Sequence, residues 1–258
     1  MAILTLRPRR WSRRLCLILL LFYGLPLLGS TGYWLLADHP QDWRTARRDS
    51  TSQAPDPRYT REAVLQVYAG RAFRWRGIFA VHTWIAAKPT GADHYTRFEV
   101  IGFGVAEGAP AVRVRPGVPD GYWFGSRPTL LRELRGPQVD GLIARLHAAA
   151  ARYPYNHEYR LWPGPNSNTF TAYLAREVPE LGLDLPANAI GKNYIAGGGL
   201  LTTAPSGSGM QFSLYGLLSL TLGWGEGVEL DLLGLAAGLD FNRPALRLSG
   251  VGRIGFTD

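Results

Sequence analysis

The sequence predicts an α+β protein with an N-terminal transmembrane helix, an antiparallel sheet followed by helices, and a C-terminal Gly-rich β-hairpin or meander. Three observations support this fold class. Residues 15–37 carry no charged side chain, strand-like segments precede helix-like segments, and glycine-separated apolar runs occupy the C-terminal part. A length of 258 residues with 46% hydrophobic residues is sufficient for one large domain.

The uncharged segment at residues 15–37 exceeds the ~20 residues that a bilayer span requires. Arginines precede it, and Tyr33 and Trp34 lie near its far end, where interfacial aromatic residues are typical. The positive-inside rule therefore predicts a single-pass protein with its N-terminus in the cytoplasm and its C-terminal domain exported. The alternative is a cleaved signal peptide whose apolar region is residues 15–28.

Charge and cysteine content exclude several classes of function. Five arginines before the apolar segment supply most of the formal net charge of +8, and no basic stripe interleaved with aromatic residues follows, so we expect no nucleic-acid partner. The single cysteine, Cys16, lies in the apolar segment, which excludes disulfides and thiolate chemistry in the exported part. The histidines lack metal-ligand spacing, and no phosphate-binding glycine loop is present. We therefore expect neither a metal nor a cofactor.

Residues rich in β-branched and aromatic side chains predict the sheet, and apolar residues at helical spacing predict the helices that follow. The predicted strands are residues 64–69, 78–87, 95–103, 111–115 and 121–124, and the predicted helices are residues 138–152 and 169–178. The predicted organisation is a basic cytoplasmic tail (1–14), a transmembrane anchor (15–37), a linker (38–60), an α+β domain (61–196) and a Gly-rich β extension packed on the same domain (197–258).

The motif YRLWPGPNSNTF begins at Tyr159 and leads into the second predicted helix. Its Pro-Gly-Pro segment imposes a rigid, non-helical approach, and Pro179 ends the helix. A hydroxyl group at a helix N-terminus either caps the helix or acts as a nucleophile beside an anion site. The residues that can cap this helix are Asn166, Ser167 and Asn168.

In the C-terminal part, apolar runs at residues 210–222 and 228–239 flank a glycine-rich turn, which indicates a hairpin or meander. Glu226, Glu229 and Asp231 make a second membrane span unfavourable. One further hypothesis is that the apolar surface of this hairpin docks onto another envelope component, whereas the simpler interpretation is that the domain covers it.

The motif, together with GIFAVHTW at residues 77–84 and AIGKNY at residues 189–194, resembles an uncharacterised bacterial family of membrane-anchored proteins. That resemblance implies a domain of unknown function in the periplasm, joined to a single-pass anchor in the bacterial inner membrane. The chain also resembles the circularly permuted papain-like superfamily, which includes the lecithin:retinol acyltransferase-like enzymes. In that superfamily a strand histidine precedes an Asn-Cys-x-x-Phe segment that opens a helix. His82 and residues 166–170 match this order, except that Ser167 replaces the cysteine.

The first functional hypothesis is a serine-dependent amidase, esterase or acyltransferase that acts on a cell-envelope component. Ser167 would be the nucleophile and His82 the general base, because a serine hydroxyl requires an adjacent base. Glu99 would orient the imidazole ring, and Asn166 or Asn168 would donate to the oxyanion. The alternative roles are helix capping for the motif residues and structural packing in the sheet for His82.

The alternative hypothesis is a catalytically inactive binding or structural module on a papain-like scaffold. Its pocket would hold an envelope lipid, peptide or glycan, because aromatic side chains suit acyl chains and sugar rings. Packing in the hydrophobic core is the competing interpretation for each aromatic residue. The candidate ligand-binding residues are Trp84, Trp123, Tyr159, Trp162 and Asn168.

Overall fold

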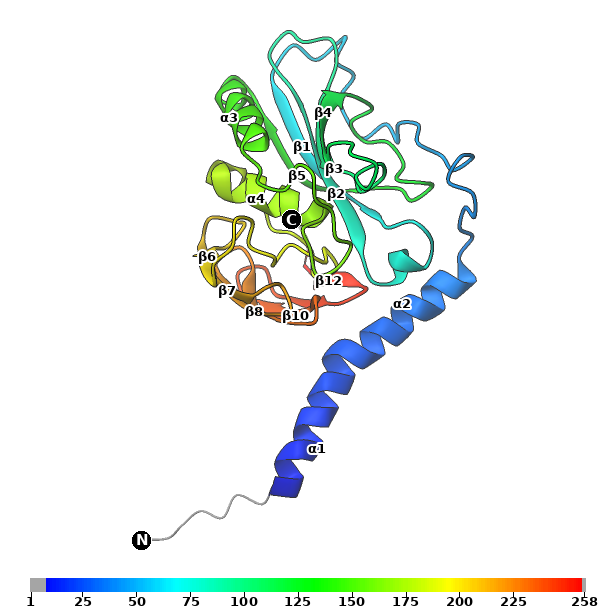
Figure 1. Ribbon diagram of the computed structural model, residues 1–258, viewed down its shortest axis with the longest axis vertical. Coiled ribbons are helices and arrows are strands. Elements are labelled where there is room, and N and C mark those ends of the chain that lie inside the picture. The colour runs from blue at the N-terminus through cyan, green and yellow to red at the C-terminus, as the bar shows by residue number, and fades with distance from the viewer. Residues whose placement is uncertain (1–7, 257–258) are drawn as a thin grey trace.

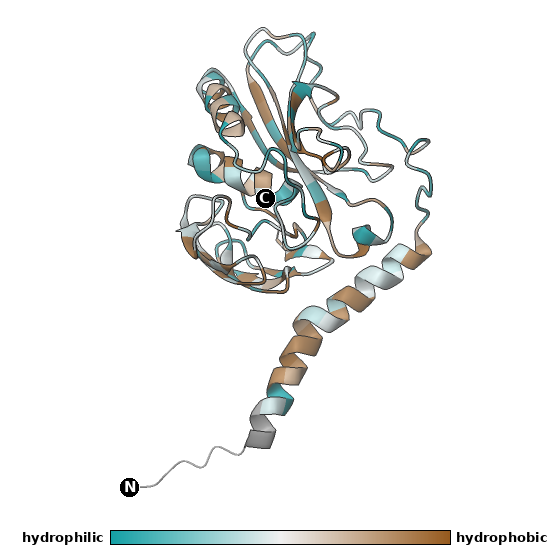
Figure 2. Cartoon of the chain, viewed as in Figure 1, coloured by the Kyte–Doolittle hydropathy of each residue, from teal (hydrophilic) through white to brown (hydrophobic). Residues whose placement is uncertain are grey.

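The computed structural model describes residues 8–256 and begins with a long helix (Figure 1). This helix consists of α1 (Pro8–Leu19), one π-helical turn η1 (Leu20–Gly24) and α2 (Leu25–Leu36). The part from Ser12 to Leu36 is long and apolar enough to cross a membrane, as its colouring in Figure 2 indicates. The predicted N-terminal apolar helix is therefore confirmed.

The first sheet is antiparallel, with the strand order β4–β3–β2–β1–β5. The predicted strand at residues 121–124 is wrong, because this segment forms only isolated bridges, and Phe124 and Gly125 adopt positive φ angles of 47° and 88° in a tight turn. The strands are β1 (Val64–Arg71), β2 (Val81–Lys88), β3 (Thr96–Val100), β4 (Val112–Pro116) and β5 (Thr129–Arg135).

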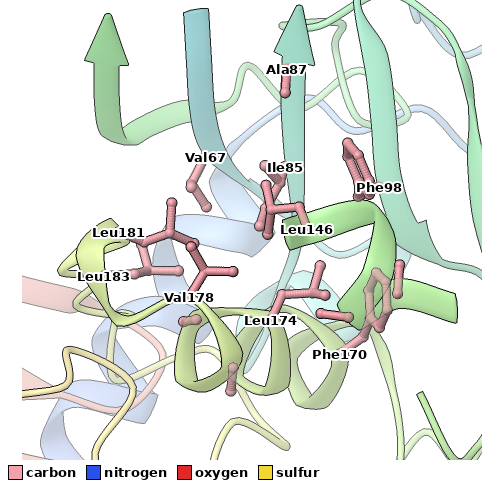
Figure 3. Packing of buried hydrophobic residues seen from close by; sticks show 14 of the residues in the cluster. Val67, Ile85, Ala87, Phe98, Leu146, Phe170, Leu174, Val178, Leu181 and Leu183 are labelled. Atoms are coloured by element: carbon pink, nitrogen blue, oxygen red, sulfur yellow. The ribbon is translucent and has the colours of Figure 1, made fainter. Parts of the chain in front are cut away.

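Helices α3 (Val139–Ala151) and α4 (Ser167–Glu177) cover one face of this sheet. The main core lies between them (Figure 3), where Ile85 from β2 packs with Leu146 from α3 and Leu174 from α4. All three side chains are fully buried, and each stabilises the fold by roughly 1.5–3 kcal/mol through removal from water. The short helices are η2 (Arg74–Ile78) before β2 and η3 (Pro179–Leu181) after α4.

The opposite face of the first sheet carries a smaller core around Trp84, and the segment at residues 38–60 covers part of it. Tyr95 donates its hydroxyl hydrogen to the Pro55 carbonyl at 3.0 Å. The Asp120 carboxylate accepts the backbone N–H of Gln53 at 2.6 Å. The segment that the sequence predicts as a linker therefore lies along the domain, held by hydrogen bonds.

The second sheet is a meander in which all strands pair antiparallel with their neighbours in sequence, which confirms the predicted C-terminal element. The two predicted apolar runs each divide into two strands, because turns with positive φ interrupt them at Tyr215 and Leu233. The strands are β6 (Leu201–Thr203), β7 (Gly209–Leu214), β8 (Leu218–Gly223), β9 (Gly227–Leu232), β10 (Leu235–Asp240), β11 (Ala245–Leu248) and β12 (Gly252–Gly255).

Buried charges join the second sheet to the rest of the domain. Lys192 Nζ lies 2.7 Å from a carboxylate oxygen of Glu229, and Arg247 Nε lies 2.9 Å from the other oxygen of the same group. Arg247 also contacts Asp184 at 2.5 Å. Because these side chains are paired and hydrogen-bonded, their burial is tolerated, and loss of one partner would leave an uncompensated charge.

Candidate functional site

The motif positions the N-terminus of α4 through a capping box at Asn166. The Asn166 side-chain oxygen accepts the backbone N–H groups of Asn168 and Thr169, and Thr169 Oγ1 accepts the backbone N–H of Asn166 at 3.1 Å. The backbone of Asn166 is extended, as expected for an N-cap. Asn166 is therefore the cap, and the capping role considered for Ser167 is wrong because Ser167 is the first residue of the helix.

The side-chain amides of the two motif asparagines are fully engaged in hydrogen bonds. Asn166 Nδ2 donates to the carbonyls of Leu161 and Ile190, both at 3.1 Å. Asn168 Nδ2 donates to the carbonyls of Val81 at 3.0 Å and Ile190 at 2.8 Å. In this conformation neither amide has a hydrogen left for a substrate oxyanion, so both hold the motif against β2 and the loop at Ile190.

His82 lies near the start of β2 and is 7% exposed. Its Nε2 lies 3.3 Å from Glu99, and the Trp123 ring stacks on the imidazole with 3.6 Å between ring centroids. The same Glu99 oxygen accepts a hydrogen bond from Arg97 at 2.6 Å. The structure thus brings together His82 and Glu99, the base and orienting acid that the sequence suggests.

Burial, hydrogen bonding and the charge of Arg97 together set the protonation state of this pair. Burial lowers the pKa of His82, against the hydrogen bond and charge of Glu99, which raise it. Burial alone would raise the pKa of Glu99, but the hydrogen bond with His82 and the positive charge of Arg97 outweigh it and hold the pKa at about 2. We therefore assign a neutral imidazole whose Nε2–H donates to an ionised Glu99, which leaves Nδ1 as an acceptor.

Ser167 is 5% exposed. In the part of the chain that the structure describes, its Oγ makes no hydrogen bond to His82. Helix α4 docks instead on the next strand residue, since Thr83 Oγ1 donates to Asn168 at 2.9 Å. Successive strand residues point to opposite faces of a sheet, so His82 lies on the face that carries Trp84. The catalytic roles of Ser167 and His82 stay predictions.

Two of the four aromatic residues predicted to bind a ligand pack together, since the rings of Trp84 and Trp123 lie 6.0 Å apart between centroids. Trp84 is fully buried and donates to the Pro119 carbonyl at 2.7 Å, while Trp162 is half exposed and donates to the Leu233 carbonyl at 2.8 Å. Tyr159 packs against Gly102, where an added Cβ would come within 2.4 Å of its ring. Their role in ligand binding stays a prediction.

Sequence reasoning missed a cavity of about 780 Å³ beside the end of α2. Tyr33 and Trp34 from this helix line it, together with six arginines and two aspartates, and none of the four predicted aromatic residues does. Arg71 there donates to the carbonyls of Gly77 at 2.7 Å and Gly250 at 2.9 Å. The signal in the sequence is weak, because three of these arginines, Arg243, Arg247 and Arg253, lie in the C-terminal part and the other three lie far from them in the chain.

The fold and the site define an α+β domain joined to an N-terminal helix that could cross a membrane. A family model described as a protein of unknown function (DUF3750) matches residues 62–194, about half of the chain, and the chain belongs to this family. The match includes the first sheet, both packed helices and the motif. No curated protein and no solved structure matches the chain, so the papain-like resemblance gains no support from these comparisons.

Proposed function

We propose that this protein is anchored in the bacterial inner membrane by its N-terminal helix and carries a periplasmic serine-dependent amidase, esterase or acyltransferase for an envelope component. The observation that carries this proposal is the buried His82–Glu99 pair, because it holds a neutral imidazole in a fixed orientation. The pair is adjacent in the strand to Thr83, on which the first turn of α4 docks, but it lies on the opposite face of the sheet.

The first turn of α4 supplies the other elements of acyl transfer. Ser167 Oγ would attack the substrate carbonyl and pass its proton to His82 Nδ1. Because His82 lies on the face of the sheet opposite α4, this transfer requires the start of β2 to rearrange when substrate binds. The backbone N–H of Ser167 has no hydrogen-bond partner among residues 8–256, in contrast to those of Asn168 and Thr169. It would therefore donate to the developing oxyanion, assisted by the helix dipole.

A fluorophosphonate probe, which reacts with activated serine hydroxyls, tests this proposal on the full chain in nonionic detergent. We expect labelling of the wild type, loss of labelling in Ser167→Ala and His82→Ala, and retention in the matched control Ser219→Ala, which removes another buried serine. An unlabelled wild type, or labelling that survives Ser167→Ala, would overturn the enzymatic proposal.

The arginine-lined cavity favours a second candidate, a catalytically inactive module that binds an envelope lipid, peptide or glycan bearing an anionic group. Guanidinium groups suit phosphate and carboxylate, and Tyr33 and Trp34 place the cavity at the helix end, where headgroups of a crossed membrane would lie. Short-chain phosphatidylglycerol, compared with phosphatidylcholine, should then raise the melting temperature equally in the wild type and Ser167→Ala. Equal melting temperatures in the two lipids would refute this candidate.

A further inference from the structure

The second sheet has its polar and apolar faces reversed relative to an ordinary sheet of a water-soluble domain. Its inward side chains along β9 include Glu229 and Asp231, which are 2% and 3% exposed. Its outward side chains are apolar, and each is between 39% and 51% exposed. These outward residues are Met210, Phe212, Leu214, Leu218, Leu220, Leu222, Val228, Leu230, Leu239, Leu246 and Ile254.

Exposure of this apolar outward face to water would be energetically unfavourable. An antiparallel sheet usually places one face on the core and a polar face in solvent. No charged side chain is exposed on β7 to β10, because Glu229, Asp231 and Asp240 all point inward and are buried. Contiguous exposed apolar surfaces of this kind mark a contact with a membrane or another protein.

The anchor helix indicates which of these contacts the face makes. Tyr23 donates its hydroxyl hydrogen to the Leu230 carbonyl on β9 at 3.0 Å, and Ser30 donates to the Gly250 carbonyl at 3.0 Å. The helix runs beneath the second sheet in Figure 1, and its π-helical turn contacts β10. The apolar sheet face is thus continuous with the apolar surface of the helix.

The depth of this contact follows from the length of the helix. Tyr23 is near the middle of the apolar segment Ser12–Leu36, so at 1.5 Å per residue about 20 Å of helix separates it from Leu36. The hydrocarbon core of a bilayer is about 30 Å thick. If the helix crosses the bilayer, even with a strong tilt, the part of β9 beside Tyr23 lies within or directly at the hydrocarbon.

We propose that the outward face of the second sheet, centred on β8 and β9, is immersed in the leaflet on the domain side, where it contacts the acyl chains of the membrane that the helix crosses. The meander permits this because the backbone groups of its inner strands pair with neighbouring strands. The proposal rests on the membrane anchoring in the proposed function, and is independent of whether the domain is an enzyme.

Depth-dependent fluorescence quenching tests the proposal on the full chain in vesicles of phosphatidylethanolamine and phosphatidylglycerol. An environment-sensitive NBD label on the native Cys16, which is exposed on the helix, reports anchoring. In a Cys16→Ser background, Leu220→Cys places the label at the centre of the sheet face. The matched control, Ala92→Cys, lies in the β2–β3 hairpin, at the far end of the domain from the helix in Figure 1.

We expect the Leu220→Cys label to emit at shorter wavelength and to be quenched by lipids with a nitroxide midway along the acyl chain, comparably to the Cys16 label. The Ala92→Cys label should show water-like emission. A quenched Cys16 label with a water-like Leu220→Cys label would refute the sheet immersion and leave the anchor intact, whereas two water-like labels would refute the anchor itself. A blue-shifted but unquenched Leu220→Cys label would also refute immersion, since a second protein copy would then cover the face. Phe212→Cys provides an independent position on the same face.

Discussion

Replacing Asp231 by asparagine should stabilise the protein at neutral pH and reduce the dependence of its stability on pH. Burial raises the pKa of this carboxyl group to about 7, and repulsion from Glu229 adds to the rise, although the hydrogen bond from Asn193 opposes it. One carboxylate oxygen of Asp231 is buried without a hydrogen-bond partner. Ionisation of this group is therefore unfavourable in the folded state.

The sign and size of the effect follow from proton linkage. Because the folded-state pKa is raised, the folded protein binds the proton more tightly, and stability falls as pH rises from about 4 to about 7. A rise of about three pKa units corresponds to roughly 4 kcal/mol, at 1.36 kcal/mol per unit. Asparagine cannot ionise, so the free energy of unfolding of Asp231→Asn relative to the wild type should increase by up to this amount across the window.

Urea unfolding of the full chain in nonionic detergent, followed by tryptophan fluorescence at about pH 5 and about pH 8, measures the part of this difference that falls between pH 5 and pH 7, which is roughly 3 kcal/mol. Asp120→Asn is a control of opposite sign. Burial would raise the pKa of Asp120, but hydrogen bonds from Ser50 and the backbone N–H of Gln53 lower it, so its ionised form stabilises the fold above the unfolded-state pKa. Both assay pH values lie above that pKa, so Asp120→Asn should destabilise the protein equally at the two pH values, and the contribution of Asp120 is lost only at lower pH. A difference between Asp231→Asn and the wild type that does not change with pH would refute the reasoning.

Two further substitutions test the packing around the motif and the sheet. Asn166→Ala should lower the free energy of unfolding by about 2 kcal/mol, since it removes an N-cap worth about 1 kcal/mol and leaves the Leu161 carbonyl without a donor, whereas the Ile190 carbonyl keeps its hydrogen bond from Asn168. Urea unfolding within experimental error of the wild type would contradict the capping assignment. Trp84→Ala should cost about 3–5 kcal/mol because the side chain is fully buried, whereas Trp224→Ala, at a 72% exposed turn, should change stability by less than about 0.5 kcal/mol in detergent. Equal losses for the two tryptophans in the same assay would show that burial of Trp84 does not determine its contribution.

The predicted elements follow local rules, which explains why the sequence indicates them. The apolar helix, the strand around Val67, the helix around Leu146 and the meander after Gly209 each depend on the spacing of apolar residues within one segment. Pro179 and the polar motif residues likewise locate both ends of α4 to within a few positions. The strand predicted at residues 121–124 is wrong because this segment adopts positive φ angles, which residue composition does not specify.

Only part of the candidate site could be predicted from patterns in the sequence. His82 and Glu99 could be paired from the sequence because neighbouring antiparallel strands bring them together, and the structure places them 3.3 Å apart. The sequence could not show that Asn166, rather than Ser167, caps α4, because several adjacent residues have the required side chain. The selection depends on the extended backbone of Asn166 and its contacts with the distant carbonyl of Ile190.

The sequence by itself determined the apolar N-terminal segment, the order of strands and helices, and the position of the single cysteine in that segment, because these depend on composition and local periodicity. Only the tertiary structure decided which face of the second sheet points outward, since alternation defines two faces without specifying which one packs inward. It also decided that arginines as far apart in sequence as Arg71 and Arg247 line one cavity beside Tyr33. Both features arise from long-range packing, in which buried ion pairs with Lys192 and Asp184 hold the polar face of the second sheet inward.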